Sequence, residues 1–220
     1  MKRASATGSA ARWLSCSLGA AAALVVAACG AVGPPPVTYV LGMPPSVQTG
    51  VEPLLGRPVI ELKPVLLPDY LDTSELLVRH EGNVVAPSLV GRWGERLSVG
   101  LTRALAGALT RRLPGVVITT TSTERPACEM LVDVETFERA PDALVGLVAQ
   151  WRLLDGVSRR ALAGERVSLW EPVGGPDDTA TVTAMSRAIE RFADGAAATI
   201  RRTGRPCGGP SIKRTLGEGA

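Results

Sequence analysis

The sequence predicts an α+β domain, with two amphipathic helices packed on one face of a mostly antiparallel or mixed sheet. Two segments repeat apolar residues at the helical period, and several others have the composition and alternation of strands. The strand candidates are residues 38–43, 58–67, 75–80, 83–86, 116–121, 129–139, 143–154 and 161–170. The order is strands, one helix, a run of antiparallel strands and a second helix, which is typical of the α+β class.

The first helix is expected over residues 92–113. Leucines recur every four residues from Leu97 to Leu113, while arginines lie mostly off this stripe. Pro114-Gly115 then ends the helix. A stripe of this kind is expected to pack against the core of the domain, and a helix that lies on a membrane surface is the alternative.

The second helix is expected to begin near Asp177 and to end near Arg202. Asp177, Asp178 and Thr179 carry side chains that cap helix N-termini. Arg201 and Arg202 fall in the last turn, where the helix dipole favours cations. The apolar stripe consists of Met185, Ala188, Ile189, Phe192, Ala196 and Ile200.

Two strand candidates carry clear signs of how they are buried. Within 129–139, Met130, Val132 and Val134 alternate with acidic residues, which predicts one face on the core and one in water. Residues 143–149 are apolar on both faces and therefore indicate a central strand. Asp155-Gly156 indicates a hairpin turn before the last strand candidate.

The composition narrows the classes of function. The chain has 220 residues, enough for one ordinary domain, and its 24 basic and 21 acidic residues give a net charge of +3. This balance excludes a strongly basic nucleic-acid-binding domain, so we expect no nucleic acid partner. An aromatic content of 4% argues against stacking surfaces, and a single histidine, His80, argues against histidine-rich metal sites.

Residues 1–28 have the features of an export signal. Basic residues at positions 2, 3 and 12 precede an apolar stretch from Leu18 to Ala28, which is shorter than the roughly 20 residues that cross a bilayer. The stretch ends in Val26-Ala27-Ala28-Cys29-Gly30, which resembles the bacterial lipobox. The resemblance implies cleavage before Cys29 and attachment of acyl chains, palmitate among them, that anchor the protein to a membrane. An ordinary cleaved signal peptide with an incidental cysteine is the alternative.

The residue after Cys29 bears on the choice of membrane. In enterobacterial sorting, Asp at that position holds a lipoprotein at the inner membrane, so Gly30 favours the outer membrane. We therefore expect a protein of the cell envelope, lipid-anchored at the outer membrane and facing the periplasm. The signal contains three basic residues and no acidic residue, so the rest of the chain carries 21 of each and no net charge.

Cys128 and Cys207 remain in the exported chain. An even pair of cysteines in an oxidising compartment predicts a disulfide, and two unrelated thiols are the alternative. The predicted parts of the chain are the lipoprotein signal peptide (1–28), the lipidated cysteine with a Pro/Gly-rich tether and a short first strand (29–57), the globular domain (58–202) and a flexible tail (203–220).

The residues offer little for catalysis. The sequence has no phosphate-binding loop, dinucleotide fingerprint, Gly-x-Ser-x-Gly or paired Cys-x-x-Cys motif. No nucleophile is indicated beside His80, and Cys128 could act as one only if it is not bonded. Asp69 and Asp72 are interpreted as turn residues. We predict no catalytic residue, no metal site and no cofactor other than the covalent lipid on Cys29.

Four short segments resemble a known family. They are Pro64-Val65-Leu66-Leu67-Pro68-Asp69-Tyr70-Leu71-Asp72, Leu76-Leu77-Val78-Arg79, Asn83-Val84-Val85 and Arg92-Trp93-Gly94-Glu95-Arg96-Leu97. Their order, after a lipobox and an early strand at Tyr39-Val40-Leu41, resembles that of the PqiC-like ABC-type transport auxiliary lipoproteins over residues 29–202. The resemblance implies a place beside an inner-membrane ABC transporter and a periplasm-spanning MCE-domain protein. Such systems move phospholipid or other hydrophobic substrates between the two membranes.

The residues singled out by this resemblance are Pro68, Tyr70, Leu71, Arg79, Trp93 and Leu97. Two interpretations stay open: they contact a partner, or they determine the fold, with Tyr70 and Leu71 folded back on the core and Trp93 covering the sheet end. The leading hypothesis is a non-enzymatic lipoprotein that docks on or caps an MCE conduit, a role that a homo-oligomer would suit. The alternatives are an activator of an envelope enzyme, such as a cell-wall synthase, and an enzyme that acts on envelope lipid through Cys128 or His80.

Overall fold

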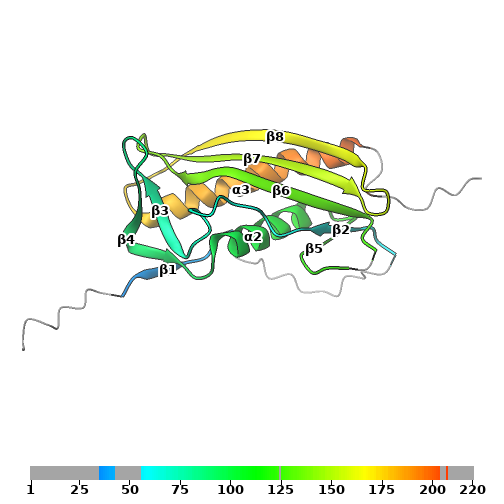
Figure 1. The fold of residues 1–220 in the computed structure, drawn as a ribbon, viewed down its shortest axis with the longest axis horizontal. Coiled ribbons are helices and arrows are strands. Elements are labelled where there is room, and N and C mark those ends of the chain that lie inside the picture. The colour runs from blue at the N-terminus through cyan, green and yellow to red at the C-terminus, as the bar shows by residue number, and fades with distance from the viewer. Residues whose placement is uncertain (1–34, 43–55, 124, 204–206, 208–220) are drawn as a thin grey trace, which may run out of the picture. The chain divides into compact units, whose positions relative to one another are not determined.

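The computed structural model describes residues 35–42, 56–123, 125–203 and 207. Eight strands and two helices follow one another in these residues (Figure 1). In chain order they are β1 (Val37–Tyr39), β2 (Val59–Leu62), β3 (Glu75–Arg79), β4 (Val85–Trp93), α2 (Leu97–Arg112), β5 (Val117–Thr119), β6 (Cys128–Arg139), β7 (Leu144–Asp155), β8 (Ala161–Pro172) and α3 (Asp178–Arg202). The predicted α+β class is confirmed.

The eight described strands form one open, mixed sheet. Its longest strands are the antiparallel set β6, β7 and β8, which are paired along nearly their whole length and end at β8 as one edge of the sheet. The other edge of β6 pairs in parallel with β2 at its beginning and with β3 at its end. β5 pairs with β2, and β4 pairs with β3 and β1. The set β6–β8 therefore positions the remaining strands.

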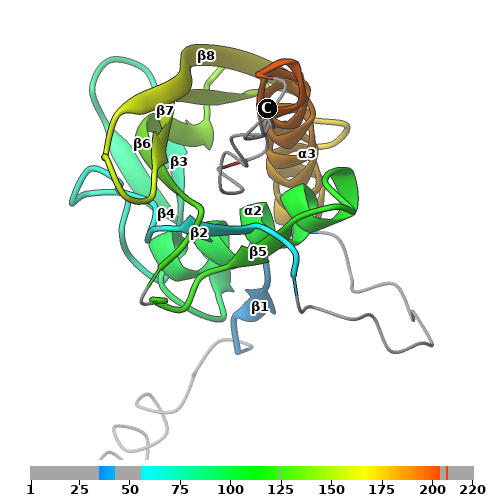
Figure 2. The same ribbon diagram turned by 90° about the vertical axis from the view of Figure 1, so that its right-hand side faces the viewer.

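Both helices lie on one side of β6–β8 and touch each other (Figures 1 and 2). The leucine stripe of α2 and the predicted stripe of α3 are buried there, as are Met130, Val132 and Val134 of β6. Asp133 and Glu135, which alternate with them, are exposed. β7 lies between β6 and β8, as its two apolar faces predicted. The core thus fills the space between the helices and this face of the sheet.

The region before α2 differs from the prediction. β4 continues to Trp93, and α2 begins at Leu97 rather than at residue 92. The N–H of Trp93 donates to the Ser74 carbonyl (2.8 Å) and that of Gly94 to the Tyr39 carbonyl (2.8 Å). These bonds to distant segments hold Arg92 and Trp93 as strand, so the predicted first turn of the helix does not form.

The strand predicted over 58–67 is also shorter. β2 ends at Leu62, and Pro64 has no N–H to continue a ladder. The chain nevertheless stays beside β6, because the N–H of Lys63 donates to the Met130 carbonyl and that of Leu66 to the Val132 carbonyl, each at 3.0 Å. This irregular extension leads into the Pro68 segment.

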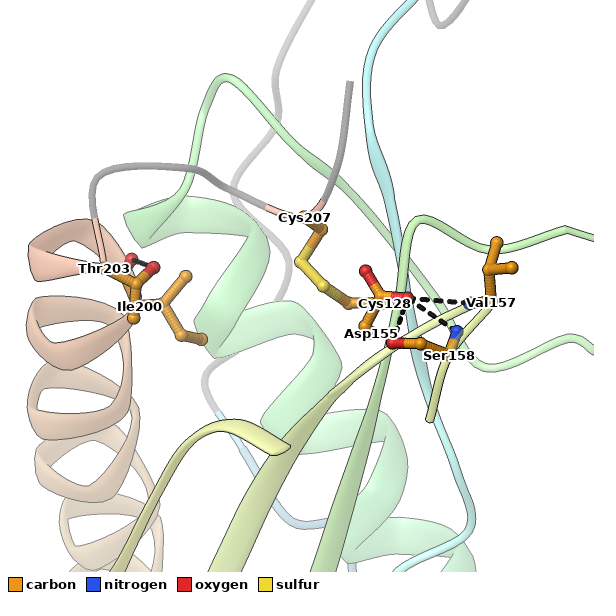
Figure 3. The surroundings of a disulfide bond; sticks show 7 residues. All are labelled: Cys128, Asp155, Val157, Ser158, Ile200, Thr203 and Cys207. Atoms are coloured by element: carbon orange, nitrogen blue, oxygen red, sulfur yellow. Dashed lines mark hydrogen bonds between the residues drawn. A yellow bond between two sulfur atoms is a disulfide. The ribbon is translucent and has the colours of Figure 1, made fainter. Parts of the chain in front are cut away.

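The predicted disulfide is present. Cys128, the first residue of β6, is bonded to Cys207 beyond the end of α3, with their Cα atoms 5.2 Å apart (Figure 3). Both cysteines are fully buried. Beside them, the Asp155 carboxylate accepts hydrogen bonds from the N–H groups of Val157 (3.1 Å) and Ser158 (2.7 Å) and so fixes the β7–β8 turn. The bond ties the chain beyond α3 to the sheet.

Candidate interaction surface

The segment Pro68–Thr73 forms a turn that meets the start of α2. The N–H of Leu71 donates to the Pro68 carbonyl (2.9 Å), and the Leu71 side chain is buried. The Thr73 carbonyl then accepts from the N–H of Leu97 (3.1 Å). Because the first N–H groups of a helix have no partner within it, this turn supplies one of the missing acceptors.

Asp72 supplies another acceptor. Its carboxylate accepts a hydrogen bond from the N–H of Ser98 (3.1 Å) and forms an ion pair with the Arg96 guanidinium. Arg96 occupies the N-cap position and makes no side-chain cap bond of its own. Burial alone would raise the pKa of the Asp72 carboxyl, but the hydrogen bonds from Ser98 and the charge of Arg96 outweigh it and hold the pKa below its ordinary value.

Four of the six motif residues therefore lie in or beside the packed interior. Leu71, Trp93 and Leu97 are buried, and Pro68 is half-buried at the turn. Together they join the turn, the end of β4 and the start of α2. Their placement agrees with the folding interpretation of these residues.

Tyr70 and Arg79 lie elsewhere. Tyr70 is 44% exposed, so the expectation that it folds back on the core is wrong. Its hydroxyl accepts from the Arg79 guanidinium (3.4 Å), whose Nε donates to Glu138 Oε1 at 2.5 Å. The outward position gives the Tyr70 hydroxyl a charged hydrogen-bond donor, the Arg79 guanidinium. The apolar core offers no such donor.

Glu138 is the buried member of this group, with 3% of its surface exposed. Its hydrogen bond to Arg79 and the attraction between their charges raise the pKa of the arginine. Burial, and next the charge of Glu138, raise the pKa of the Tyr70 hydroxyl. Glu138 Oε2 is buried and has no protein hydrogen-bond partner among the described residues. The group is thus a charged pair anchored in the sheet with one unused acceptor.

A tryptophan lies in the same row of the sheet. Glu138 is opposite Gly146 on β7, and Gly146 is opposite Trp170 on β8. A side-chain carbon at Gly146 would come within 2.6 Å of the Trp170 ring, so the ring lies over the glycine. Trp170 is 48% exposed. We call Tyr70, Arg79, Glu138 and Trp170 the sheet-face cluster.

The cluster lies on the face of the sheet away from the helices. Residues alternate between the two faces, and Arg139, the neighbour of Glu138, donates to Thr181 Oγ1 of α3 at 3.1 Å. Glu138 therefore points to the other side. Tryptophan, tyrosine and arginine are the residues most often found at the energetic centres of protein interfaces, so this arrangement is suited to binding a partner.

The other candidates from the sequence are not brought together. His80 is exposed at the β3–β4 turn, where its N–H donates to the Val84 carbonyl (2.9 Å), and Asp69 is exposed as well. Cys128 is bonded to Cys207 and offers no thiolate, so it cannot act as the nucleophile that the enzyme alternative requires. Asp177 caps α3 by accepting from the N–H of Ala180 (2.7 Å).

The described residues contain no metal-binding cluster, and the space between the sheet and the helices is nearly filled. No group of three or more histidine, cysteine, aspartate or glutamate side chains in them could hold a metal ion. A void of about 10 Å³ between the sheet and the helices, lined by Leu105, Val134 and Phe192 among others, has room for about one water molecule. That void is far too small for an acyl chain.

Neither α2 nor α3 combines the length and the apolarity that a membrane-spanning helix needs, and the same holds for every helix in the described part of the chain. Cys29, the predicted lipidation site, lies outside the described residues. The sequence therefore remains the basis for that prediction.

The fold defines a class of proteins, the α+β domains in which two helices pack against an open, mixed eight-stranded sheet. The chain belongs to the family of ABC-type transport auxiliary lipoprotein components, whose model matches residues 39–197. The predicted family is confirmed. The chain is therefore an auxiliary lipoprotein of ABC-type transport, which indicates a location in the cell envelope.

Solved structures share this fold. An uncharacterized protein has a TM-score of 0.63 at 18% identity, over 75% of this chain and 98% of its own. Protein XCC0632 from Xanthomonas campestris has a TM-score of 0.58 at 16% identity, over 77% of this chain and 94% of its own. At these identities the similarity concerns the fold alone. A search of curated proteins finds no match.

Sequence reasoning missed Glu138 and Trp170. Trp170 carries a signal that could have been used, because it stands at a strand position whose alternation favours a polar, outward side chain. Glu138 carries none, since its contact with Arg79 depends on the pairing of β3 with β6 across nearly sixty residues.

Proposed function

We propose that the protein is a non-catalytic lipoprotein, anchored in the outer membrane by the lipid on Cys29, that docks on or caps the conduit of an MCE-domain protein in an intermembrane lipid transport system. The observation that carries this proposal is the family match over residues 39–197, which spans almost the whole globular domain. The lipobox before it supplies the anchor, and the ABC transporter of the inner membrane supplies the energy.

The sheet-face cluster supports docking as the mode of action. It offers a half-exposed tryptophan and tyrosine around a charged pair, on a sheet face that no helix of the described residues covers. Aromatic anchors next to charged groups give both contact area and orientation to a protein complex. The void between the sheet and the two helices, about 10 Å³, is too small to hold an acyl chain.

In-cell photo-crosslinking tests the partner. A photoreactive residue replaces Ser168, which is exposed on the same face of β8 two positions before Trp170, and a matched one replaces Thr110, which is exposed on α2. We expect an MCE-domain protein among the mass-spectrometric partners from position 168 and its absence from position 110. Crosslinks to a cell-wall synthase at position 168 would instead support the alternative role, activation of an envelope enzyme. No envelope partner from either position would contradict docking by this face.

Metabolic labelling tests the anchor. An alkyne analogue of palmitate should label the wild-type protein, and the Cys29→Ala variant should carry no label. Wild-type protein should sediment with outer-membrane fractions in a sucrose gradient. Label on the Cys29→Ala variant, or wild-type protein in the inner-membrane fraction, would contradict the predicted site or location.

The assembly state is part of the same proposal. A homo-oligomeric ring would suit the end of a conduit, since it could surround the opening. Native mass spectrometry of the detergent-extracted, acylated protein measures it. A purely monomeric protein would restrict the role to docking at the side of the conduit.

A further inference from the structure

A second exposed surface lies at the β1 edge of the sheet. Val37 and Val40, in β1 and just after it, and Leu89 and Val90 of β4 are exposed large apolar side chains. Leu89 is 98% exposed. Val37 is opposite Gly91, two residues after Leu89, so β1 and this part of β4 are neighbours along the edge. Val37 and Val40 point to opposite faces of that edge, since a side-chain carbon on Gly91 would meet Tyr39 and one on Gly94 would meet Val40. We call these four residues the β1–β4 patch.

A fixed bulge in β4 presents two of these side chains. Leu77 pairs with Pro87 and Glu75 with Arg92, so residues 88–91 have almost no counterpart on β3. Ser88 holds the bulge: its hydroxyl donates to the Asp178 carboxylate (2.6 Å) and accepts from the N–H groups of Val90 (3.2 Å) and Gly91 (3.3 Å). Leu89 therefore projects into solvent from a well-anchored backbone.

The neighbouring strand β1 is held just as firmly. The Tyr39 hydroxyl is hydrogen-bonded to Thr179 Oγ1 (3.1 Å), and Leu41 is buried in the core. Gly42 has a φ of +93° and lies so close to Ala104 that a side-chain carbon would come within 3.0 Å of it. The segment that leads back toward Cys29 thus leaves the domain from a defined place.

The distance along the chain from this place to the predicted anchor is short. Residues 30–36 separate Cys29 from Val37. A fully extended chain covers at most about 3.6 Å per residue, so a lipid on Cys29 would keep Val37 within about 29 Å of the membrane surface. A domain that runs from β1 to the end of α3 is roughly 40 Å across, which exceeds this reach, so the surface around β1 would be the first to meet the bilayer.

We propose that the β1–β4 patch inserts into the leaflet that holds the lipid of Cys29, and so fixes the orientation of the domain on the membrane. The inference rests on the proposed function, because it needs the anchor. Apolar side chains that are scattered singly need no explanation, but four on the two faces of one sheet edge, beside an anchored segment, fit insertion of that edge into a hydrocarbon boundary. Arg92, exposed next to the bulge, would lie at the level of the headgroups.

The acylated full-length protein in phospholipid vesicles tests the proposal. A Leu89→Cys variant and a Val157→Cys variant each carry one environment-sensitive nitrobenzoxadiazole probe. Val157 is a matched control, since it is 90% exposed and lies in the β7–β8 turn, far from β1 in Figure 1. The native cysteines do not interfere, because Cys128 and Cys207 are bonded, the Cys29 thiol carries the lipid, and Cys16 lies in the signal peptide that is removed before Cys29.

We expect the probe at position 89 to emit at shorter wavelength on vesicles and to be quenched by brominated phospholipid, whereas the probe at 157 should do neither. Vesicle-bound protein with an unquenched probe at 89 would overturn the patch proposal and leave the anchor intact. Protein that fails to float with the vesicles would overturn the anchor itself. An unquenched vesicle probe at position 89, together with an in-cell crosslink from a photoreactive residue at the same position to an MCE-domain protein, would assign the patch to a protein partner instead.

A second variant guards against a local effect of the probe. With the probe moved to Val37→Cys, a Leu89→Asp substitution should reduce the quenching, because a charged side chain resists insertion into hydrocarbon. Leu89 is almost fully exposed, so this substitution leaves the packing intact. Unchanged quenching would show that Leu89 does not take part in membrane contact.

Discussion

The Asp72 carboxylate accepts a hydrogen bond from the N–H of Ser98, a residue in the first turn of α2 that follows 26 positions later. The turn at Pro68–Thr73 therefore caps a helix to which it is not adjacent in the sequence. Two further bonds, from Leu97 to Thr73 and from Trp93 to Ser74, run beside it. The turn, the end of β4 and the start of α2 are one structural unit.

Replacement of Asp72 by alanine should lower the free energy of unfolding by about 1 kcal/mol, the usual cost of a lost N-terminal cap. Urea unfolding measures the change. The matched control is Asp69→Ala, because Asp69 is exposed in the same turn. Equal stabilities of the two variants would contradict the capping role.

The same cap should give a pH dependence with a known sign. The pKa of the Asp72 carboxyl is held below its ordinary value by Ser98 and Arg96, against the effect of burial. A group with a lowered pKa stabilises the folded state when it is charged. The stability difference between wild type and Asp72→Ala should be complete above pH about 4 and should shrink as the pH falls through the lowered pKa. A difference that grows on acidification would refute this assignment.

The disulfide should contribute a large part of the stability. It closes a loop between positions 79 residues apart. For a loop of this length the restriction of the unfolded chain is worth about 4 kcal/mol. Wild-type protein should unfold at a lower urea concentration with reductant, and a Cys128→Ala, Cys207→Ala double variant should be insensitive to reductant. Equal midpoints for reduced and oxidised wild type would contradict the prediction.

Gly146 should control the position of Trp170. A Gly146→Ala substitution places a carbon where the indole ring lies, so the ring must move outward. Trp93 and Trp151 are buried, which leaves Trp170 as the accessible indole among the described residues. Acrylamide should therefore quench the fluorescence of the variant more strongly, at a cost of about 1 kcal/mol in stability. Gly115→Ala is the control, since no atom lies near that position, and it should quench like wild type.

The sequence pattern predicted those parts of the fold that depend on residues close together in the chain. The stripes of α2 and α3 and the alternation in β6 depend on residues a few positions apart, and burial follows the pattern directly. The disulfide followed from the predicted compartment and an even pair of cysteines. Asp177 was recognised as a cap because its acceptor role is confined to its own helix.

Pairings between distant segments could not be predicted in this way. The second half of β4 is a strand because β1 and Ser74 bind it, and Pro87 and Ser88 interrupt any alternation there. Glu138 and Trp170 share a row only because two strand registers place Gly146 between them. The motif residues Tyr70 and Arg79 were found by family resemblance, but their contact with Glu138 needed the fold.

The coupling of Tyr70 to Glu138 can be measured directly. Burial and the Glu138 carboxylate raise the pKa of the Tyr70 hydroxyl above its ordinary value of about 10. The chain has two tyrosines, so a Tyr39→Phe background isolates Tyr70 in an absorbance titration. Glu138→Gln should lower the midpoint, because the nearby negative charge is removed. The control is Glu135→Gln, an exposed carboxylate of the same strand that pairs with Arg166, and it should leave the midpoint unchanged. The raised pKa means that the folded state favours the neutral phenol. This contribution to stability is fully present below pH about 10, the ordinary pKa of tyrosine, and is lost as the pH rises through the raised pKa of Tyr70. A midpoint that does not respond to Glu138→Gln would show that the tyrosine and the buried carboxylate are not coupled.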